Sequence, residues 1–242
     1  ICAQYLFYTA ETVAMIERSI RRKPADRARK QCIRKFLYYF KKGYQDPTYI
    51  AWERQYKLDA HYEFQEALNR KSFAALLKSG NYQDVAMTAV RIESRTNLLF
   101  SFEKMALRDA IKVPEGAKAF ATGLYDYLYG SGSLEQRFLS FRDIVGELPR
   151  RQTRVLTWPL LTVFGFIGNP HEHMFLKPRV TQVAAEKYAF DFYYKSRPNW
   201  DTYQSLLDFA AQVRADTRML KPADYIDLQS FIWVMGSDEY PD

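Results

Sequence analysis

Apolar residues recur every three or four positions through most of the chain, which is the spacing of amphipathic helices. Residues 47–69 give the clearest example. One face of this segment is apolar, at Tyr49, Trp52, Tyr56, Ala60, Phe64, Ala67 and Leu68. The opposite face carries Glu53, Lys57 and His61. The pattern therefore predicts one helix whose aromatic side chains face the protein core.

Capping residues divide this helical pattern into segments. Asp46 before Pro47 and Asn199 before Trp200 are typical of N-caps, and Ser133 with Gln136 fits a capping box. Proline at the first helical position is indicated at Pro114, Pro178 and Pro222. These signals predict helices over 3–21, 26–42, 47–69, 71–79, 82–94, 98–112, 114–129, 133–146, 153–167, 178–189, 200–216 and 222–235.

The chain is predicted to be all-α. No segment alternates convincingly between apolar and polar residues, and residues 190–195 are interpreted as a loop. We expect one compact multi-helix domain, 1–242, of about a dozen helices, with a seam near 130–133 if it divides into two lobes. The expected core is aromatic, built around Trp52, Tyr56, Phe100, Phe102, Trp158, Phe164 and Trp233.

Positive charge is concentrated in residues 18–42. This basic segment contains eleven lysines and arginines and a single acid, Asp26, so it carries +10 in a chain whose net charge is +7. Its apolar stripe consists of Ile33, Phe36, Leu37 and Phe40. Arg27, Arg34 and Lys41 are seven positions apart and lie on a different face of the predicted helix.

Such a segment favours an anionic partner, because lysines and arginines release the counterions condensed on a phosphate chain. Tyr38, Tyr39 and Tyr44 lie nearby and could stack on bases. The alternative is a solvated helix face whose long side chains cover apolar surface. The expected anion-binding residues are Arg21, Arg22, Lys23, Arg27, Lys30, Arg34 and Lys41.

A second candidate site contains His171 and His173. A His-x-His pair in an extended segment places two imidazoles on one side, as metal sites often do, but no third or fourth ligand has suitable spacing. Lys177 and Arg179 flank the start of a predicted helix, where backbone N–H groups favour anions. These four residues are the candidate catalytic residues of an acid–base enzyme. The alternative is a polar turn in which one histidine caps backbone groups.

Several enzyme classes are disfavoured. The chain has no Gly-x-x-x-x-Gly-Lys-Ser/Thr, no Gly-x-Gly-x-x-Gly and no Gly-x-Ser-x-Gly motif, and Cys2 and Cys32 lack the spacing of a redox or zinc pair. We predict no cofactor and no bound metal. Two widely separated cysteines are typical of a reduced, cytoplasmic protein. The longest stretch without Asp, Glu, Lys or Arg, 155–171, is shorter than the about 20 residues of a membrane span, so no membrane partner is expected.

Four blocks of the chain, 49–68, 96–111, 157–179 and 224–235, together resemble a family of bacterial hypothetical proteins of similar length. None of the blocks is a named catalytic motif. The resemblance implies a bacterial, cytoplasmic, stand-alone helical protein, and it carries over no functional residue. The last block, with Gln229, Ser230 and Trp233, is also similar to the closing segment of some proteins associated with DNA restriction and defence.

Three functions are consistent with these patterns. The first is a binding module that contacts nucleic acid or another polyanion through the basic segment 18–42. The second is a helical protein-interaction or homo-oligomerisation protein, which the 18 tyrosines favour because tyrosine is enriched at interfaces. The third is an enzyme with an acid–base or metal site near His171 and His173.

Overall fold

The computed structural model describes residues 10–151 and 153–242, with side chains from residue 24 onward. It consists of helices and connecting loops, and no strand occurs in these residues, so the predicted all-α class is confirmed. Residues 190–195 are a loop, as predicted. Cys2 and the first part of the expected helix 3–21 lie outside the described residues. None of the described helices combines the length and apolar character needed to cross a bilayer.

Most helices are joined by short connections. The α-helices are α1 (Ala10–Tyr39), α2 (Pro47–Tyr49), α3 (Gln55–Leu68), α4 (Arg70–Lys78), α5 (Tyr82–Ser94), α6 (Ser101–Ile111), α7 (Pro114–Tyr129), α8 (Leu134–Glu147), α9 (Trp158–Gly168), α10 (Pro178–Lys187), α11 (Trp200–Asp216) and α12 (Tyr225–Gly236). The remaining helical turns are η1 (Gly43–Gln45), the π-helical η2 (Ile50–Arg54) and η3 (Arg218–Leu220).

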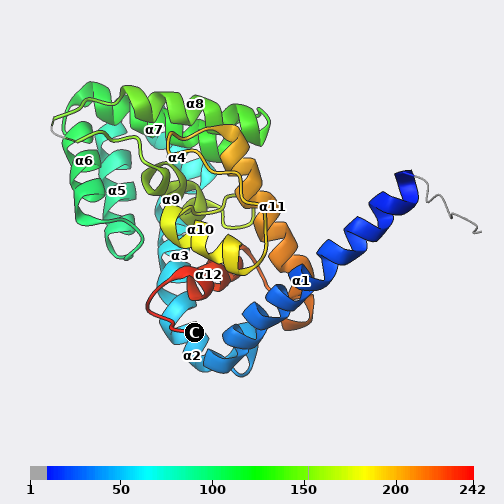
Figure 1. Ribbon diagram of the computed structural model, residues 1–242. Helices are drawn as coiled ribbons and strands as arrows, with labels where there is room; N and C mark the ends of the chain where they lie inside the picture. Colours follow the sequence, from blue (N-terminus) through cyan, green and yellow to red (C-terminus); the bar gives the residue numbers. More distant parts are fainter. Residues whose placement is uncertain (1–9, 152) are drawn as a thin grey trace, which may run out of the picture.

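Helix α9 lies near the centre of the molecule, and all of its residues are buried (Figure 1). Helices α3, α5, α7 and α8 pack against it, while α10 and α12 pack against each other. A helix that is apolar on every side belongs in a core, which explains this position. The loop 130–133 joins α7 to α8, which pack together, and one buried hydrophobic cluster includes residues from both sides of the loop.

Helix α1 has a docked part and a projecting part. Its carboxyl-terminal part packs on α10 and α12, whereas its amino-terminal part extends away from the body (Figure 1). The sequence predicts a break near Pro24, and this prediction is wrong, because α1 is continuous through that residue. Proline fixes φ near −65°, a helical value, so the helix continues and loses about one backbone hydrogen bond.

Most of the predicted caps have their predicted role. As predicted, the side chains of Asp46, Ser133 and Asn199 each accept a hydrogen bond from the first turn of the helix that follows. Pro222 does not open a helix. The preceding Lys221 has a φ of 56°, and α12 begins only after Asp224, whose carboxylate caps it. Position 222 therefore belongs to the linker before α12.

Two further helices begin later than predicted. Helix α6 begins at Ser101 rather than 98, because Phe100 is extended and its N–H donates to the Glu103 carboxylate at 3.0 Å. Helix α9 begins at Trp158 rather than 153, because the Thr157 hydroxyl accepts a hydrogen bond from the first turn. In both cases a local hydrogen bond, and not the apolar pattern, sets the first helical residue.

The largest error in the predicted pattern concerns residues 47–69. The π-helical turn η2 contains one residue more than an α-helical turn, so it rotates the helix that follows. Glu53 and Lys57, predicted on the polar face, are only 5% and 2% exposed. Trp52, predicted in the core, is 61% exposed. The predicted assignment of buried and exposed faces in this segment is therefore wrong at Trp52, Glu53 and Lys57.

The core is only partly where the sequence predicts it. Trp158 and Phe164 are buried, whereas Tyr56 and Trp233 are half-buried. Phe100 and Phe102 are exposed at the start of α6, where their rings stack with centroids 5.7 Å apart. Other large side chains fill the interior, among them Phe36, Phe40, Tyr49, Phe120, Phe138 and Tyr203.

Candidate functional site

The apolar face of α1 holds its carboxyl-terminal part on the body. Cys32, Phe36 and Phe40 are buried. The Phe36 ring centroid lies 5.2 Å from that of Phe231 in α12 and 5.0 Å from that of Tyr44. Aromatic pairs at these distances stabilise packing beyond their buried area. The apolar stripe predicted in this segment is thus its packing face, and the opposite face remains in solvent.

The solvent-facing side of α1 carries a row of residues that we name the α1 stripe: Arg27, Lys30, Arg34, Tyr38 and Lys41. They are three or four positions apart, the spacing of one helix face, and Lys41 lies just beyond the last turn. All five are exposed, Tyr38 to 77%. Within the described residues the four cations form no ion pair. From Arg27 to Tyr38 the stripe extends about 16 Å along the helix axis.

Other cations of the basic segment differ from the stripe. The side chains of Arg21, Arg22 and Lys23 lie outside the described part of the chain. Arg29 and Lys35 are half-buried and have acidic partners. Arg29 Nε lies 3.8 Å from Asp216 Oδ2, and Lys35 Nζ lies 2.6 Å from Asp242 Oδ1. Among its described side chains, the segment therefore contains cations with acidic partners, Arg29 and Lys35, and exposed cations without one, which include those of the stripe and Lys42.

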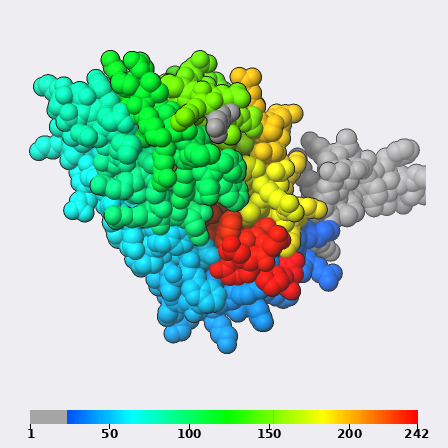
Figure 2. All heavy atoms as spheres, turned by 90° about the vertical axis from the view of Figure 1, so that its left-hand side faces the viewer, coloured from blue at the N-terminus to red at the C-terminus, as the bar shows by residue number. Residues whose placement is uncertain are grey.

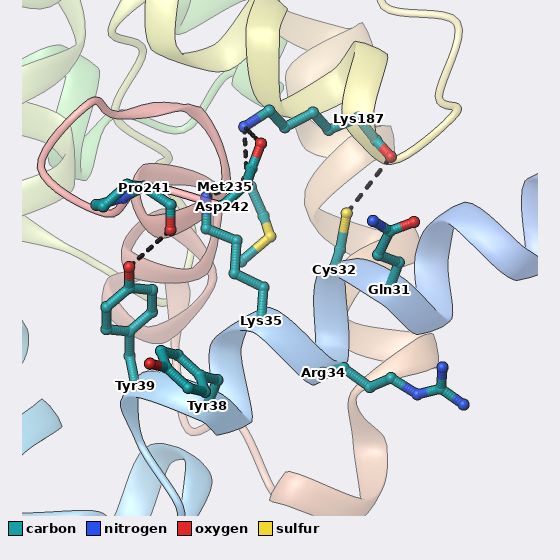
Figure 3. Close-up of a pocket in the computed structure, with 10 residues that line it drawn as sticks. All are labelled: Gln31, Cys32, Arg34, Lys35, Tyr38, Tyr39, Lys187, Met235, Pro241 and Asp242. Carbon is teal, nitrogen blue, oxygen red and sulfur yellow. Dashed lines mark hydrogen bonds and ion pairs between the residues drawn. The ribbon is translucent and has the colours of Figure 1, made fainter.

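A pocket of about 780 Å³ lies between α1, α10 and the last residues of the chain (Figure 3). Asp242 lies across it and accepts hydrogen bonds from Lys187 at 2.7 Å and from Lys35 at 2.6 Å. Tyr39 donates to the Pro241 carbonyl at 2.6 Å. Hydrogen bonds from Lys187 and Lys35 lower the pKa of Asp242. The ionised Asp242 carboxylate thus pairs with Lys35 and Lys187, the two lysines that an anionic ligand in this pocket would contact.

Cys32 lines the same pocket, but its chemistry is that of a structural thiol. Its Sγ donates to the Lys187 carbonyl oxygen at 3.4 Å. Burial raises the pKa of Cys32 to about 11, against the opposing effect of Lys187 and Lys35. Because the thiolate is the reactive form, this cysteine is a poor nucleophile at neutral pH.

The two histidines of the second candidate site are separated by burial. His171 is exposed, whereas His173 is fully buried and neither of its ring nitrogens makes a hydrogen bond within the described residues. Burial, and to a smaller extent Arg137, lowers the pKa of His173 to about 3. Its ring packs against that of Tyr127 at 4.4 Å. No group of three or more metal-ligating side chains occurs in the described part of the chain.

Lys177 is directed at Leu98 and Phe100 and not at the histidines. Lys177 Nζ donates to the Leu98 carbonyl oxygen at 2.8 Å and lies 3.5 Å from the ring centroid of Phe100, and burial lowers its pKa. Arg179 is exposed. The four candidate catalytic residues therefore occupy separate environments, and the structure does not assemble them into one acid–base site.

A cluster of buried charges, which the sequence did not predict, links η2, α3 and α12. We call it the Arg54 network, and its members are Tyr49, Glu53, Arg54, Lys57, Asp224, Asp227, Ser230 and Tyr240. Arg54 donates to both oxygens of Asp224, at 2.9 and 2.7 Å, and to Asp227 at 2.7 Å. Tyr49 also donates to Asp227, at 2.6 Å. A two-pronged arginine–carboxylate contact of this kind fixes geometry as well as charge.

Lys57 is the most deeply buried cation of this network. Its Nζ lies 3.2 Å from a Glu53 oxygen and 2.9 Å from the Ser230 hydroxyl oxygen. The other Glu53 oxygen accepts a hydrogen bond from Tyr240 at 2.6 Å. Burial lowers the pKa of Lys57, and Glu53 opposes this effect. Burial likewise raises the pKa of Asp227, against its hydrogen bond from Tyr49. Every charge has a partner, which is typical of a structural cluster.

One signal for this network is present in the sequence. Glu53 and Lys57 are four positions apart, which is the spacing of an ion pair on a helix. The spacing does not reveal that both turn inward, because Ser230 and Tyr240, which satisfy them, are distant in sequence.

No protein-family model, curated protein or solved structure matches the chain. The resemblance of its four blocks to a bacterial family therefore stays a prediction. The α1 stripe and the pocket beside it form the candidate binding surface.

Proposed function

We propose that the protein binds nucleic acid or another polyanion through the α1 stripe. The observation that carries this proposal is a row of four exposed cations without acidic partners in the described residues, on the solvent-facing side of α1, whose amino-terminal part extends from the body (Figure 1). A phosphate chain lying along this row would release the counterions condensed on it, and this release favours binding.

Tyr38 favours nucleic acid among the polyanions. Its side chain is 77% exposed, lies between Arg34 and Lys41 in sequence, and packs edge-on against Tyr39 at 5.2 Å. An exposed aromatic ring next to phosphate-binding cations is a platform for an unpaired base. We therefore expect single strands to bind better than duplexes of equal length.

The other functions have less support. The four candidate residues of the enzyme hypothesis do not converge. The protein-interaction hypothesis is supported by Phe100 and Phe102, whose stacked rings are 54% and 51% exposed at the start of α6. If no nucleic acid bound even at low salt, this exposed pair would become the better-supported functional surface.

The test is fluorescence anisotropy with labelled single-stranded and duplex oligonucleotides at two salt concentrations. Four phosphate contacts predict that affinity for a single strand falls about 50-fold for a fourfold rise in salt. A variant that combines Arg27→Glu, Arg34→Glu and Lys41→Glu should lose binding, while circular dichroism shows unchanged helix content.

A matched control separates the stripe from the overall charge. The control combines Lys71→Glu, Lys78→Glu and Arg91→Glu, three exposed residues on α4 and α5, and has the same net charge as the stripe variant. It should keep the salt dependence of the wild type. Equal loss of binding in both variants, or normal binding by the stripe variant, would show that the stripe is not the binding surface.

A further inference from the structure

A second pocket, of about 390 Å³, lies where η2 and α3 meet the end of α12 and the last residues of the chain. Its lining residues are Trp52, Glu53, Tyr56, Asn97, Trp233, Glu239 and Tyr240. Figure 2 shows the carboxyl-terminal segment (red) beside the cyan residues of the α2–α3 region on this face. Four of the seven lining residues are aromatic, so the pocket presents ring surface from two distant parts of the sequence.

The aromatic walls are held by the fold. The π-helical turn η2 turns Trp52 outward, and Trp233 stands half-buried on α12. The Tyr240 ring packs against Tyr39 at 5.0 Å and Phe40 at 5.9 Å, and its hydroxyl donates to Glu53. Tyr240 is thus fixed before any ligand arrives, which lowers the entropy that binding would cost.

The charges in this pocket are negative. Glu53 lines the pocket, and its charge is balanced by the buried Lys57, whose Nζ also lies 5.2 Å from the centroid of the Tyr56 ring. Glu239 stands exposed at the rim, accepts a hydrogen bond from Trp233 Nε1 at 3.2 Å, and forms no ion pair in the described part of the molecule. Burial raises the pKa of Tyr56, and Glu53 and Glu239 add to this effect, so its phenol stays neutral.

The contrast with the pocket beside α1 is informative. That pocket is lined by Arg34, Lys35 and Lys187, whereas no lysine or arginine lines the aromatic pocket, in a chain with 35 such residues. An anionic ligand would therefore find no counter-charge here. A metal ion would find one free carboxylate, and no group of three ligating side chains occurs in the described residues.

We propose that this pocket binds an organic cation, an alkylated ammonium group, between Trp52, Tyr56, Trp233 and Tyr240, with Glu239 at the rim as its counter-charge. Aromatic faces attract a cation through their quadrupole, and an alkylated ammonium also buries methyl groups against the rings. This inference is independent of polyanion binding, since it involves a different pocket and the opposite charge.

Isothermal titration with choline tests the proposal, and 3,3-dimethylbutan-1-ol, its neutral isostere, provides the matched ligand. Choline should bind with a Kd of about 1 mM or tighter, and the alcohol should bind at least about fivefold more weakly, because it has the same shape without the charge. Equal affinity for the two ligands, or no heat with choline at about 10 mM, would overturn the proposal.

Two variants and one control place the binding site. Glu239→Gln should weaken choline binding about fivefold and leave the alcohol unchanged, because it removes only a charge. Trp52→Ala removes an exposed wall and should also weaken choline binding about fivefold. Trp200→Phe, a change at a tryptophan that packs on Phe138 at 5.8 Å outside this pocket, should have no effect. Unchanged choline affinity in both pocket variants would contradict the assignment.

Discussion

The Arg54 network and the α1 stripe differ in the surroundings of their cations. In the network, Lys57 is buried and Arg54 is half-buried, and each is matched by carboxylates at 2.7 to 3.2 Å. In the stripe, four cations stand in water without a partner in the described residues. Burying a charge is costly unless a partner compensates it, whereas an exposed charge needs none. The difference separates cations that hold the fold from cations available for binding.

The largest expected effect comes from removing the cation that pairs with two buried carboxylates of the network, Asp224 and Asp227. Arg54→Leu leaves Asp224 and Asp227 buried without their counter-charge, so we expect the free energy of unfolding to fall by about 3–5 kcal/mol. Urea denaturation followed by circular dichroism measures it. Arg27→Leu in the stripe is the matched control and should change stability by less than about 0.5 kcal/mol. Similar effects in the two variants would contradict the distinction.

His173 sharpens the comparison, because it is a buried titratable group whose ring nitrogens make no hydrogen bond in the described residues, although its Nε2 lies 3.5 Å from a Glu172 carboxylate oxygen. Its pKa is about 3 in the folded protein and 6.5 in the unfolded chain, so the unfolded state binds the extra proton as the pH falls between these values. The contribution of His173 to the free energy of unfolding should therefore be fully present above pH 6.5. Below pH 6.5 it should decline by about 1.4 kcal/mol per pH unit.

The measurement is urea denaturation of the wild type and of His173→Leu between pH 7 and pH 4. The difference between the two proteins isolates this histidine from the carboxylates that titrate in the same range. His171→Gln, a change at the exposed neighbour, should follow the wild type. A variant as acid-sensitive as the wild type would show that His173 is not the group responsible.

The smallest expected effect concerns Asp242, which occupies Lys35 and Lys187 with a chain carboxylate. Asp242→Asn should raise the affinity for a single-stranded oligonucleotide about threefold at low salt, because an exposed ion pair no longer competes for these lysines. Asp238→Asn, at an exposed acid outside the pocket, is the control. An unchanged affinity in anisotropy measurements would show that these lysines take no part in binding.

Local chemistry made much of the fold predictable. Asp46, Ser133 and Asn199 cap helices as the sequence indicates, and α11 has its predicted bounds, because a cap and the turn it serves are neighbours in the chain. Helix α7, which begins at Pro114, also has its predicted bounds. The α1 stripe was contained in the predicted basic segment for the same reason: charge density and helical spacing are local properties.

Features that depend on distant partners were not predictable. Spacing alone does not separate Lys35 from Arg34, because the pairing of Lys35 with Asp242 is set by tertiary packing. The inward turn of Lys57 likewise depends on Ser230, which lies far along the chain. The π-helical turn before it reverses the expected positions of Trp52 and Glu53. A prediction that assumes 3.6 residues per turn throughout the segment misses the extra residue of the π-helical turn, and so assigns these side chains to the wrong face.

The last residues of the chain connect the two pockets. Tyr240 forms a wall of the aromatic pocket, and Asp242 lies across the pocket beside α1, with Pro241 between them. A ligand that displaces this short segment from one pocket changes the free energy of ligand binding in the other pocket. Thermodynamic linkage makes this effect reciprocal. If an organic cation alters the affinity for an oligonucleotide by some factor, the oligonucleotide must alter the affinity for the cation by the same factor.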